Sequence, residues 1–249
     1  MKRIMLLAMA LLLSLPIMWG QGKRVLFIGD SITDGAWGAN NGRPSKERNH
    51  WDWNHIFGHG YMADCASYYM SRRPMQDYEF LNRGISGNEL GDLEARWQED
   101  VVDMKPDVLS VLIGTNDAGH YLRSLSQKPG QPFDFAAWDA RYRRLLDRVR
   151  EQNPNVLFVL CAPFVERVGE VGKAPDYDQR RQIVCQLSAL VRQMARDYDA
   201  VFLPFDKMFD KLVRKEPRPD YWIWDGIHPT PAGHRRMAEM WISKVNLKP

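Results

Sequence analysis

The 249-residue chain has few cysteines, and they do not form an obvious framework. The set of Cys65, Cys161 and Cys185 is odd and sparse, which argues against a fold built on disulfides, although one bridge can form in an oxidising compartment. Cys161 and Cys185 lie in stretches with periodic apolar residues. We therefore expect both to be buried as small hydrophobic side chains.

The chain also lacks an excess of charge of one sign. Its net charge is +3, and without Lys2 and Arg3 it would carry 32 basic against 31 acidic side chains. Such a balance gives no case for a nucleic-acid partner. After residue 20 no apolar run is long enough to cross a bilayer, and no repeat, low-complexity tract or linker is visible. The sequence thus predicts one domain, residues 21–249, without an integral membrane span.

The first 20 residues carry a targeting pattern. A short basic start is followed by an almost unbroken apolar run, Ile4 to Leu15, which Pro16 ends before small residues near Gly20. The apolar run is too short for a membrane span, and this order of features is typical of a secretory signal peptide. We expect residues 1–20 to be removed near Gly20 and the mature protein to be secreted or periplasmic. No cysteine lies near that point to carry a lipid anchor.

Apolar runs alternate with helical patterns through the rest of the chain. Near-continuous apolar strands indicate a sheet covered on both faces, and the predicted strands are Val25–Ile28, Tyr78–Leu81, Val108–Ile113, Val156–Leu160 and Val201–Leu203. Helical stripes run from Trp138 to Val149 and from Ile183 to Tyr198, and Thr230 can cap a final helix. This alternation predicts one α/β domain, a flavodoxin-like three-layer α/β/α fold with a central five-stranded parallel sheet. Residues 35–60 and 118–134 are expected to form long connections.

Four polar segments follow the predicted strands or precede the final helix. They are Gly29-Asp30-Ser31, residues 82–88 (NRGISGN), residues 114–117 (GTND) and residues 225–229 (DGIHP). In a doubly wound sheet the carboxyl ends of the strands meet at one edge, where such folds bind ligands. We expect these segments to converge there.

Together the segments supply the groups that acyl transfer needs. A serine hydroxyl is a poor nucleophile until a base removes its proton. Ser31 would be the nucleophile, His228 its base, and Asp225 the acceptor that holds the other imidazole N–H. The backbone N–H of Ser31, a glycine N–H from the second segment and the side-chain amide of Asn116 can stabilise the oxyanion.

The four segments resemble the conserved blocks of the SGNH hydrolase superfamily, also called GDSL esterases and lipases, in the family's order. The resemblance spans the chain from the first strand to the last helix. It implies Ser31, Asp225 and His228 as the catalytic triad, with Ser31, Gly87 and Asn116 forming the oxyanion hole. The family pattern Ile-Ser-Gly favours Gly87 over Gly84. One departure is that the first block reads Gly-Asp-Ser-Ile-Thr where the family name implies Leu after Ser.

An aromatic stretch follows the nucleophile. Exposed Trp37, Trp51, Trp53 and His55 would suit stacking on sugar rings, and Trp224, just before Asp225, could line the same site. The alternative is that the aromatic residues are buried, in a self-packed loop or in the core. The three histidines at 50, 55 and 59 match no compact ligand motif, so we predict no metal site. We also predict no cofactor, because ester hydrolysis here needs none.

The sequence therefore predicts a serine carboxylic-ester hydrolase. We expect it to cleave short acyl groups, O-acetyl in particular, from a small-molecule or polysaccharide ester. We infer the carbohydrate preference from the signal peptide, the aromatic loop and the substrates that are common in this family. A lysophospholipase or thioesterase with the same residues is the main alternative. A carbohydrate-binding protein without activity is a rival that the complete triad disfavours.

Overall fold

The computed structural model describes residues 22–125 and 129–247, so the predicted signal peptide, residues 1–20, lies outside them. A five-stranded sheet with every strand pair parallel forms the centre, in the order β2-β1-β3-β4-β5. The strands are β1 Arg24–Gly29, β2 Glu79–Gly84, β3 Val108–Leu112, β4 Leu157–Cys161 and β5 Val201–Leu203. This order reverses between β1 and β3, as in flavodoxin-like folds. The predicted fold class is confirmed.

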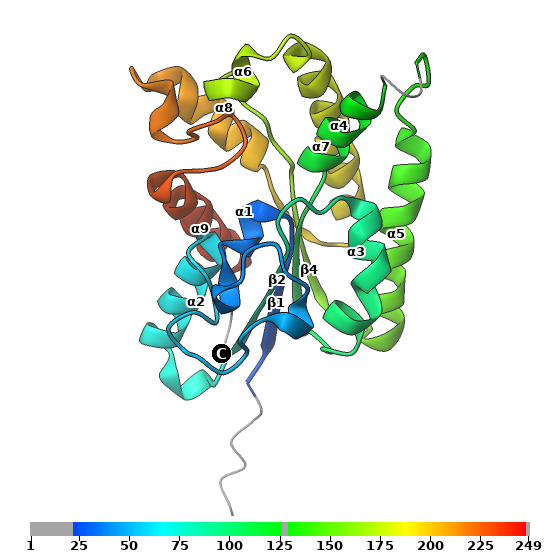
Figure 1. Cartoon of the computed structure of the whole chain (residues 1–249). Helices are drawn as coiled ribbons and strands as arrows, with labels where there is room; N and C mark the ends of the chain where they lie inside the picture. Colours follow the sequence, from blue (N-terminus) through cyan, green and yellow to red (C-terminus); the bar gives the residue numbers. More distant parts are fainter. Residues whose placement is uncertain (1–21, 126–128, 248–249) are drawn as a thin grey trace, which may run out of the picture.

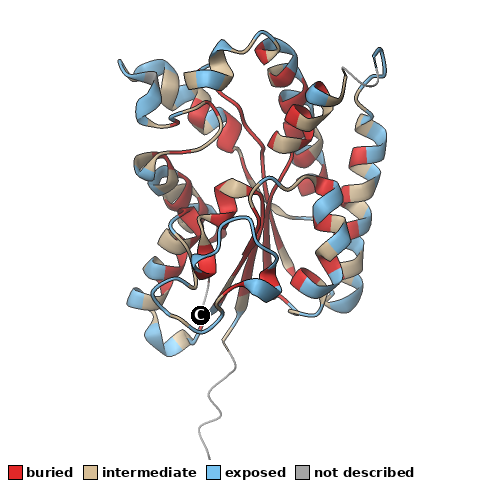
Figure 2. Cartoon of the chain, viewed as in Figure 1, coloured by how far each residue is buried: buried red, intermediate tan, exposed pale blue. Residues whose placement is uncertain are grey.

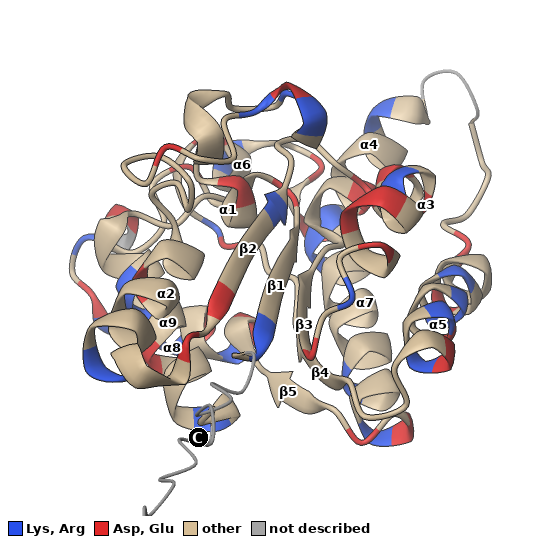
Figure 3. Ribbon diagram, turned by 90° about the horizontal axis from the view of Figure 1, so that it is seen from below, with Lys and Arg blue, Asp and Glu red and all other residues tan. Residues whose placement is uncertain are grey.

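Helices cover both faces of the sheet, which gives three layers (Figure 3). One face carries α2 (Tyr61–Arg72), α8 (Phe205–Lys215) and α9 (Pro231–Val245), and the other carries α3 (Leu90–Trp97), α5 (Phe135–Gln152) and α7 (Tyr177–Asp197). The central strands are buried along their length (Figure 2). Alternate strand residues enter different clusters, since Leu26 and Ile28 pack with the second group of helices and Val25 and Phe27 with the first. This explains why the strands read as continuous apolar runs.

Shorter helices complete the chain. Helix α1 (Ser31–Asp34), α4 (Thr115–Ser124) and α6 (Gly169–Lys173) lie toward the end of the molecule where the strands finish (Figure 1). The remaining short turns of helix are η1 Trp37–Ala39, η2 Ser45–Glu47, η3 Pro74–Gln76, η4 Gln98–Val102 and η5 Pro219–Tyr221. Within the described ranges, no helix is both long and apolar enough to span a membrane.

The three helices expected from periodicity are present as α5, α7 and α9. Trp138, Tyr142, Leu145 and Val149 are buried on one side of α5, as their spacing requires. At the start of α9, Thr230 Oγ1 accepts a hydrogen bond from Gly233 N at 3.3 Å, so the expected cap is confirmed.

Three expectations need correction. Residues 118–124 belong to α4 and are not part of a long connection, and of the described residues that follow, 129–134 contain no helix or strand before α5 begins. Strand β2 extends to Gly84, three residues beyond the predicted end at Leu81. Cys185 is exposed, whereas Cys161 is buried as expected. Position 185 is turned away from the buried stripe of α7, which contains Ile183, Val184 and Leu187.

Candidate active site

Ser31, His228 and Asp225 form a continuous hydrogen-bonded chain. Ser31 is the first residue of α1, directly after β1, and its Oγ lies 2.8 Å from His228 Nε2. His228 Nδ1 lies 2.6 Å from Asp225 Oδ2. The other carboxylate oxygen, Asp225 Oδ1, accepts the backbone N–H groups of Ile227 at 2.9 Å and His228 at 2.7 Å. The structure therefore brings together the three side chains predicted from the sequence, with the serine hydroxyl bound to the imidazole and the imidazole bound to the carboxylate.

In these hydrogen bonds, the negative charge of Asp225 and the positive charge of protonated His228 stabilise each other. The hydrogen bond to Asp225 raises the pKa of His228 above its ordinary 6.5, against a smaller opposing effect of burial. For Asp225, burial pushes the pKa up, but the hydrogen bonds from the His228 side chain and two backbone N–H groups outweigh it and lower the pKa. Asp225 thus stays ionised beside an imidazole that readily holds a proton.

The turn that presents Ser31 is fixed by its own sequence. Asp30 Oδ1 accepts the N–H of Ile32 at 3.0 Å and caps α1, and Gly35 ends that helix in the left-handed region at φ +51°. Asp30 is almost completely buried, and burial raises its pKa to about 7. The single turn of helix therefore holds the serine at the end of β1.

The predicted oxyanion donors lie on neighbouring segments of the same edge. Gly87 is exposed, has φ +84° and has open space where a Cβ would point. Asn116 Nδ2 donates to Asn88 O at 3.2 Å, which orients the amide and leaves its second hydrogen available. Over the described part of the chain, the backbone N–H groups of Ser31 and Gly87 donate to no protein group. Both can therefore serve a bound oxyanion.

The loop that carries the acid and base is tied at several points. Glu166 N donates to Gly226 O at 2.8 Å, and Gly226 adopts φ +101°, where a side chain would be strained. Trp224 N donates to His228 O at 3.2 Å, and the Trp224 ring stacks at 6.3 Å from the imidazole. Trp224 is 59% exposed, so its free face is open beside the site.

The aromatic stretch divides into buried and exposed residues. Trp37 is 1% exposed and its Nε1 donates to Gly84 O at 2.8 Å, so the expectation that its ring is exposed for stacking on a sugar is wrong, and the alternative of a buried aromatic residue holds for it. Trp51 and Trp53 are 80% and 71% exposed, and His55 lies 3.8 Å from Asp52. Among the described residues, no hydrogen bond, ion pair or ring contact joins these three side chains to the triad.

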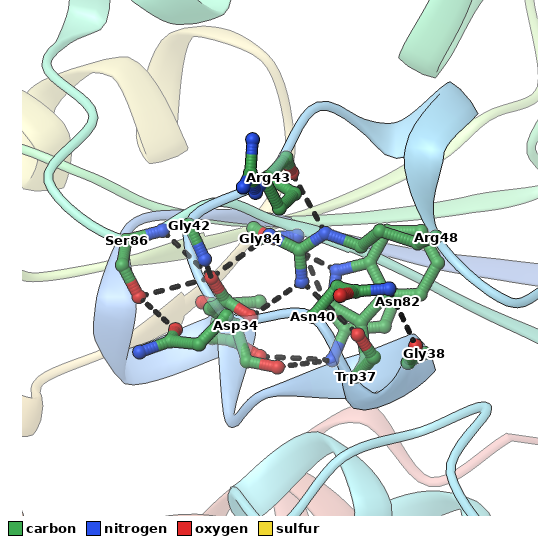
Figure 4. Close-up of polar contacts among 12 residues, drawn as sticks. Asp34, Trp37, Gly38, Asn40, Gly42, Arg43, Arg48, Asn82, Gly84 and Ser86 are labelled. Carbon is green, nitrogen blue, oxygen red and sulfur yellow. Dashed lines mark hydrogen bonds and ion pairs between the residues drawn. The ribbon is translucent and has the colours of Figure 1, made fainter.

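A buried ion pair at the end of α1 escaped the sequence analysis (Figure 4). Asp34 and Arg48 have fully buried side chains and form two hydrogen bonds, Nη1 to Oδ1 at 2.6 Å and Nη2 to Oδ2 at 3.0 Å. The guanidinium also lies 4.6 Å from the Trp37 ring. These residues join α1 to the 35–60 loop, whose fold a periodicity search cannot detect.

The described ranges contain no group of three or more histidine, cysteine, aspartate or glutamate side chains that could hold a metal ion. A parallel α/β sheet with a hydrogen-bonded serine, histidine and aspartate at its carboxyl edge is the arrangement of a serine-type hydrolase.

Residues 27–236 match the model of the GDSL-like lipase/acylhydrolase family, and the chain belongs to that family. It is 31% identical over 230 residues to an acetylxylan esterase of Geobacillus stearothermophilus, covering 92% of this chain and 96% of that enzyme. These similarities make the protein a carboxylic-ester hydrolase of the SGNH or GDSL type.

Solved structures agree. A GDSL-like protein of Parabacteroides merdae superposes with a TM-score of 0.76 at 32% identity, covering 92% of this chain and 97% of that chain. The Geobacillus stearothermophilus acetylxylan esterase Axe2 gives a TM-score of 0.72 at 30% identity, over 92% and 96% of the two chains. Catalytic mutants of Axe2 replace a serine, an aspartate or a histidine, and the latter two are three positions apart.

Proposed function

We propose that the protein hydrolyses esters through Ser31, His228 and Asp225. The observation that carries the proposal is the unbroken chain of short contacts from Ser31 Oγ through His228 to Asp225. His228 would take the Ser31 proton as the hydroxyl attacks the ester carbonyl, and would then give it to the leaving alcohol. Water, activated by the same histidine, would release the acid from the acyl-serine.

The tetrahedral intermediates would be stabilised by the backbone N–H groups of Ser31 and Gly87 and by the Asn116 amide. Three donors that are preorganised around a developing charge commonly make the largest contribution to such catalysis. Two of them are backbone groups, and they therefore remain when side chains are replaced. Asn116 is the one donor that a simple substitution removes.

The proposed substrate is an O-acetyl ester on a carbohydrate. A relative 31% identical over most of both chains is an acetylxylan esterase. The site is also open, since Gly87 and Trp224 are exposed and the His228 side chain is 39% exposed. An open site admits an ester attached to a polymer, and the free face of Trp224 would stack on a sugar ring.

A carbohydrate polymer is encountered outside the cell, which agrees with the signal peptide expected in residues 1–20. We infer that the enzyme is exported, to the periplasm or beyond. Mass spectrometry of the N-terminus of the mature protein would test the export, because an unprocessed chain would contradict it.

Replacement of the nucleophile tests the central proposal. We expect Ser31→Ala to lower kcat toward a small aryl acetate by about 10⁴-fold or more, since the acyl-enzyme can no longer form. A fluorophosphonate probe should label Ser31 in the wild-type enzyme, and chelators should leave activity unchanged. Labelling of another residue would overturn the assignment of Ser31 as nucleophile. Absence of labelling would favour a protein that only binds carbohydrate.

The tryptophan beside the site tests the carbohydrate part. We expect Trp224→Ala to raise KM for acetylated xylo-oligosaccharides about tenfold, because a stacking contact contributes roughly 1 kcal/mol or more. KM for a small aryl acetate should change little. The matched control is Trp51→Ala, which removes a tryptophan that is more exposed than Trp224, at 80% against 59%, and has no ring contact with the triad among the described residues.

The substrate panel also separates the rival activities. Acetate release from acetylated oligosaccharides should exceed turnover of lysophospholipids and acyl thioesters by a wide margin. Faster turnover of long-chain lysophospholipids or thioesters would mean that the same catalytic residues serve a lysophospholipase or a thioesterase.

A further inference from the structure

We propose that Asp34 is a positioning residue that holds the Gly87 segment in register with Ser31, with Arg48 as its buried counter-ion. This inference rests on the proposed function, because it assigns Gly87 an oxyanion to bind. Asp34 is the last residue of the helix that Ser31 begins. Its side chain therefore connects the helix of the proposed nucleophile to Ser86, the neighbour of the proposed donor Gly87.

Asp34 is a shared acceptor for two segments of the rim (Figure 4). Its Oδ2 accepts the backbone N–H of Ser86 at 2.7 Å and the Ser86 hydroxyl at 2.9 Å. The same oxygen accepts Gly42 N at 3.1 Å from the 35–60 loop. Ser86 immediately precedes Gly87, so its N–H fixes the peptide plane one residue before the proposed oxyanion donor.

Arg48 compensates the charge of the Asp34 carboxylate, which is fully buried. Its guanidinium makes two parallel bonds to Asp34 and donates further to Trp37 O at 3.2 Å and Arg43 O at 2.8 Å. A buried carboxylate without a partner would be strongly unfavourable, whereas a bidentate guanidinium neutralises it and has its own donors satisfied. Because both side chains are fully buried, water does not compete for these bonds.

The Gly87 segment has need of such a restraint. Gly87 is exposed and has φ +84°, and no atom beyond its chain neighbours lies within 4 Å of the place where its Cβ would be, so packing on that side contributes little to its position. On its C-terminal side, Asn88 is held by Asn88 N to Ile85 O and Asn116 Nδ2 to Asn88 O, both at 3.2 Å. On its N-terminal side, Ile85 N donates to Gly29 O at 3.0 Å, and the bonds from Ser86 to Asp34 tie the residue directly before the donor to α1. Loss of the Asp34 acceptor therefore leaves the donor loosely aimed, and a misplaced donor loses most of its effect on the transition state.

The test compares two double variants that contain no unpaired buried charge. Both carry Arg48→Met; one adds Asp34→Ala and the other Asp34→Asn. Only the second keeps a neutral oxygen that can accept the Ser86 N–H. We expect kcat to fall by about 10²-fold or more with Asp34→Ala, which approaches the loss of one oxyanion donor. The Asp34→Asn variant should recover most of that loss, and KM should change little in both.

Two further readouts separate positioning from general damage. The pH midpoint of kcat/KM should match that of the wild type in both variants, because the contacts of His228 are unchanged. The second readout is kcat divided by the concentration of active sites, which is measured by titration to completion with a fluorophosphonate. Asp206→Ala serves as the control, since Asp206 is a buried carboxylate that accepts from Ser188 Oγ at 2.8 Å, between α7 and α8. It should lower thermal stability and leave kcat per site unchanged.

Equal kcat per site in the Asp34→Ala and Asp34→Asn variants would overturn the inference while leaving the proposed function intact. Absence of fluorophosphonate labelling on wild-type Ser31 would instead reject the proposed function itself. If neither double variant folds, Ser86→Pro decides, because it removes both donors that Ser86 directs at Asp34, the N–H and the hydroxyl, and leaves the Asp34–Arg48 pair in place. Wild-type kcat in that variant would likewise overturn the inference.

Discussion

At the scale of single residues, Asp225 has two roles in the proposed mechanism. One carboxylate oxygen binds the imidazole, and the other closes the loop by accepting two backbone N–H groups. The charge of Asp225 thus acts on His228 through a geometry that the same side chain maintains. Removal of the charge alone should therefore be visible in the titration of the histidine.

We predict that Asp225→Asn shifts the pH midpoint of kcat/KM to a lower value. Asp225 raises the pKa of His228, and activity requires the neutral imidazole, so wild-type activity is lost as pH falls through that raised pKa. Without the carboxylate the histidine gives up its proton at a lower pH. We also expect kcat to fall by about 10³- to 10⁴-fold, because the imidazole loses its orienting acceptor.

Rates measured from about pH 5 to 9 would show the shift. The control is Asp178→Asn, which removes an exposed carboxylate that pairs with Arg167 and has no hydrogen bond or ion pair to the triad among the described residues. An unchanged midpoint in Asp225→Asn would mean that Asp225 does not set the proton affinity of His228.

At the scale of elements, sequence reasoning succeeded where a repeating pattern or a strong local signal exists. The strands are runs of buried apolar residues, and α5 and α9 show spacing or a cap that can be read directly. Helix α4 was missed because its ten residues include few large apolar side chains and begin with Thr-Asn-Asp, a sequence typical of turns. Cys185 was misplaced because an apolar stretch does not tell which side of the helix a residue faces.

The candidate site shows the same division. The segments of Ser31, Asn116 and His228 could be placed because each lies at the end of a strand or beside the final helix. The Asp34–Arg48 pair could not, since two charged residues 14 positions apart in an irregular loop carry no periodic signal. For the same reason the sequence does not show which tryptophan of the loop is buried; in the structure it is Trp37.

At the scale of the whole molecule, pH should move stability and activity in opposite directions. Burial raises the pKa of Asp30 and of Glu166 to about 7, and the pKa of His228 is raised by its hydrogen bond to Asp225. Carboxyls ionise near 4 and histidine near 6.5 in an unfolded chain, so the folded protein holds more protons. Stability from these groups is therefore lost as pH rises through the folded pKa values.

We predict that the thermal unfolding midpoint falls between about pH 6.5 and 8, the interval in which esterase activity rises. His234 opposes the trend only at the lower end of this interval: burial lowers its folded pKa to about 4, and its unfolded form loses its proton around pH 6.5. Calorimetry at several pH values would measure the trend. Glu166→Gln should flatten it, and a midpoint that is constant or rises with pH would contradict the prediction.

The contact between Ser31 and His228 has a consequence for how the protein becomes an enzyme. The two residues are separated by 197 positions, so the proposed nucleophile lies directly after the first strand, β1, and its proposed base lies in the last loop before α9. Closing so long a segment of chain is entropically slow, and it needs every intervening layer in place. A growing or partly refolded chain therefore has no working nucleophile, and the appearance of esterase activity marks the completion of folding.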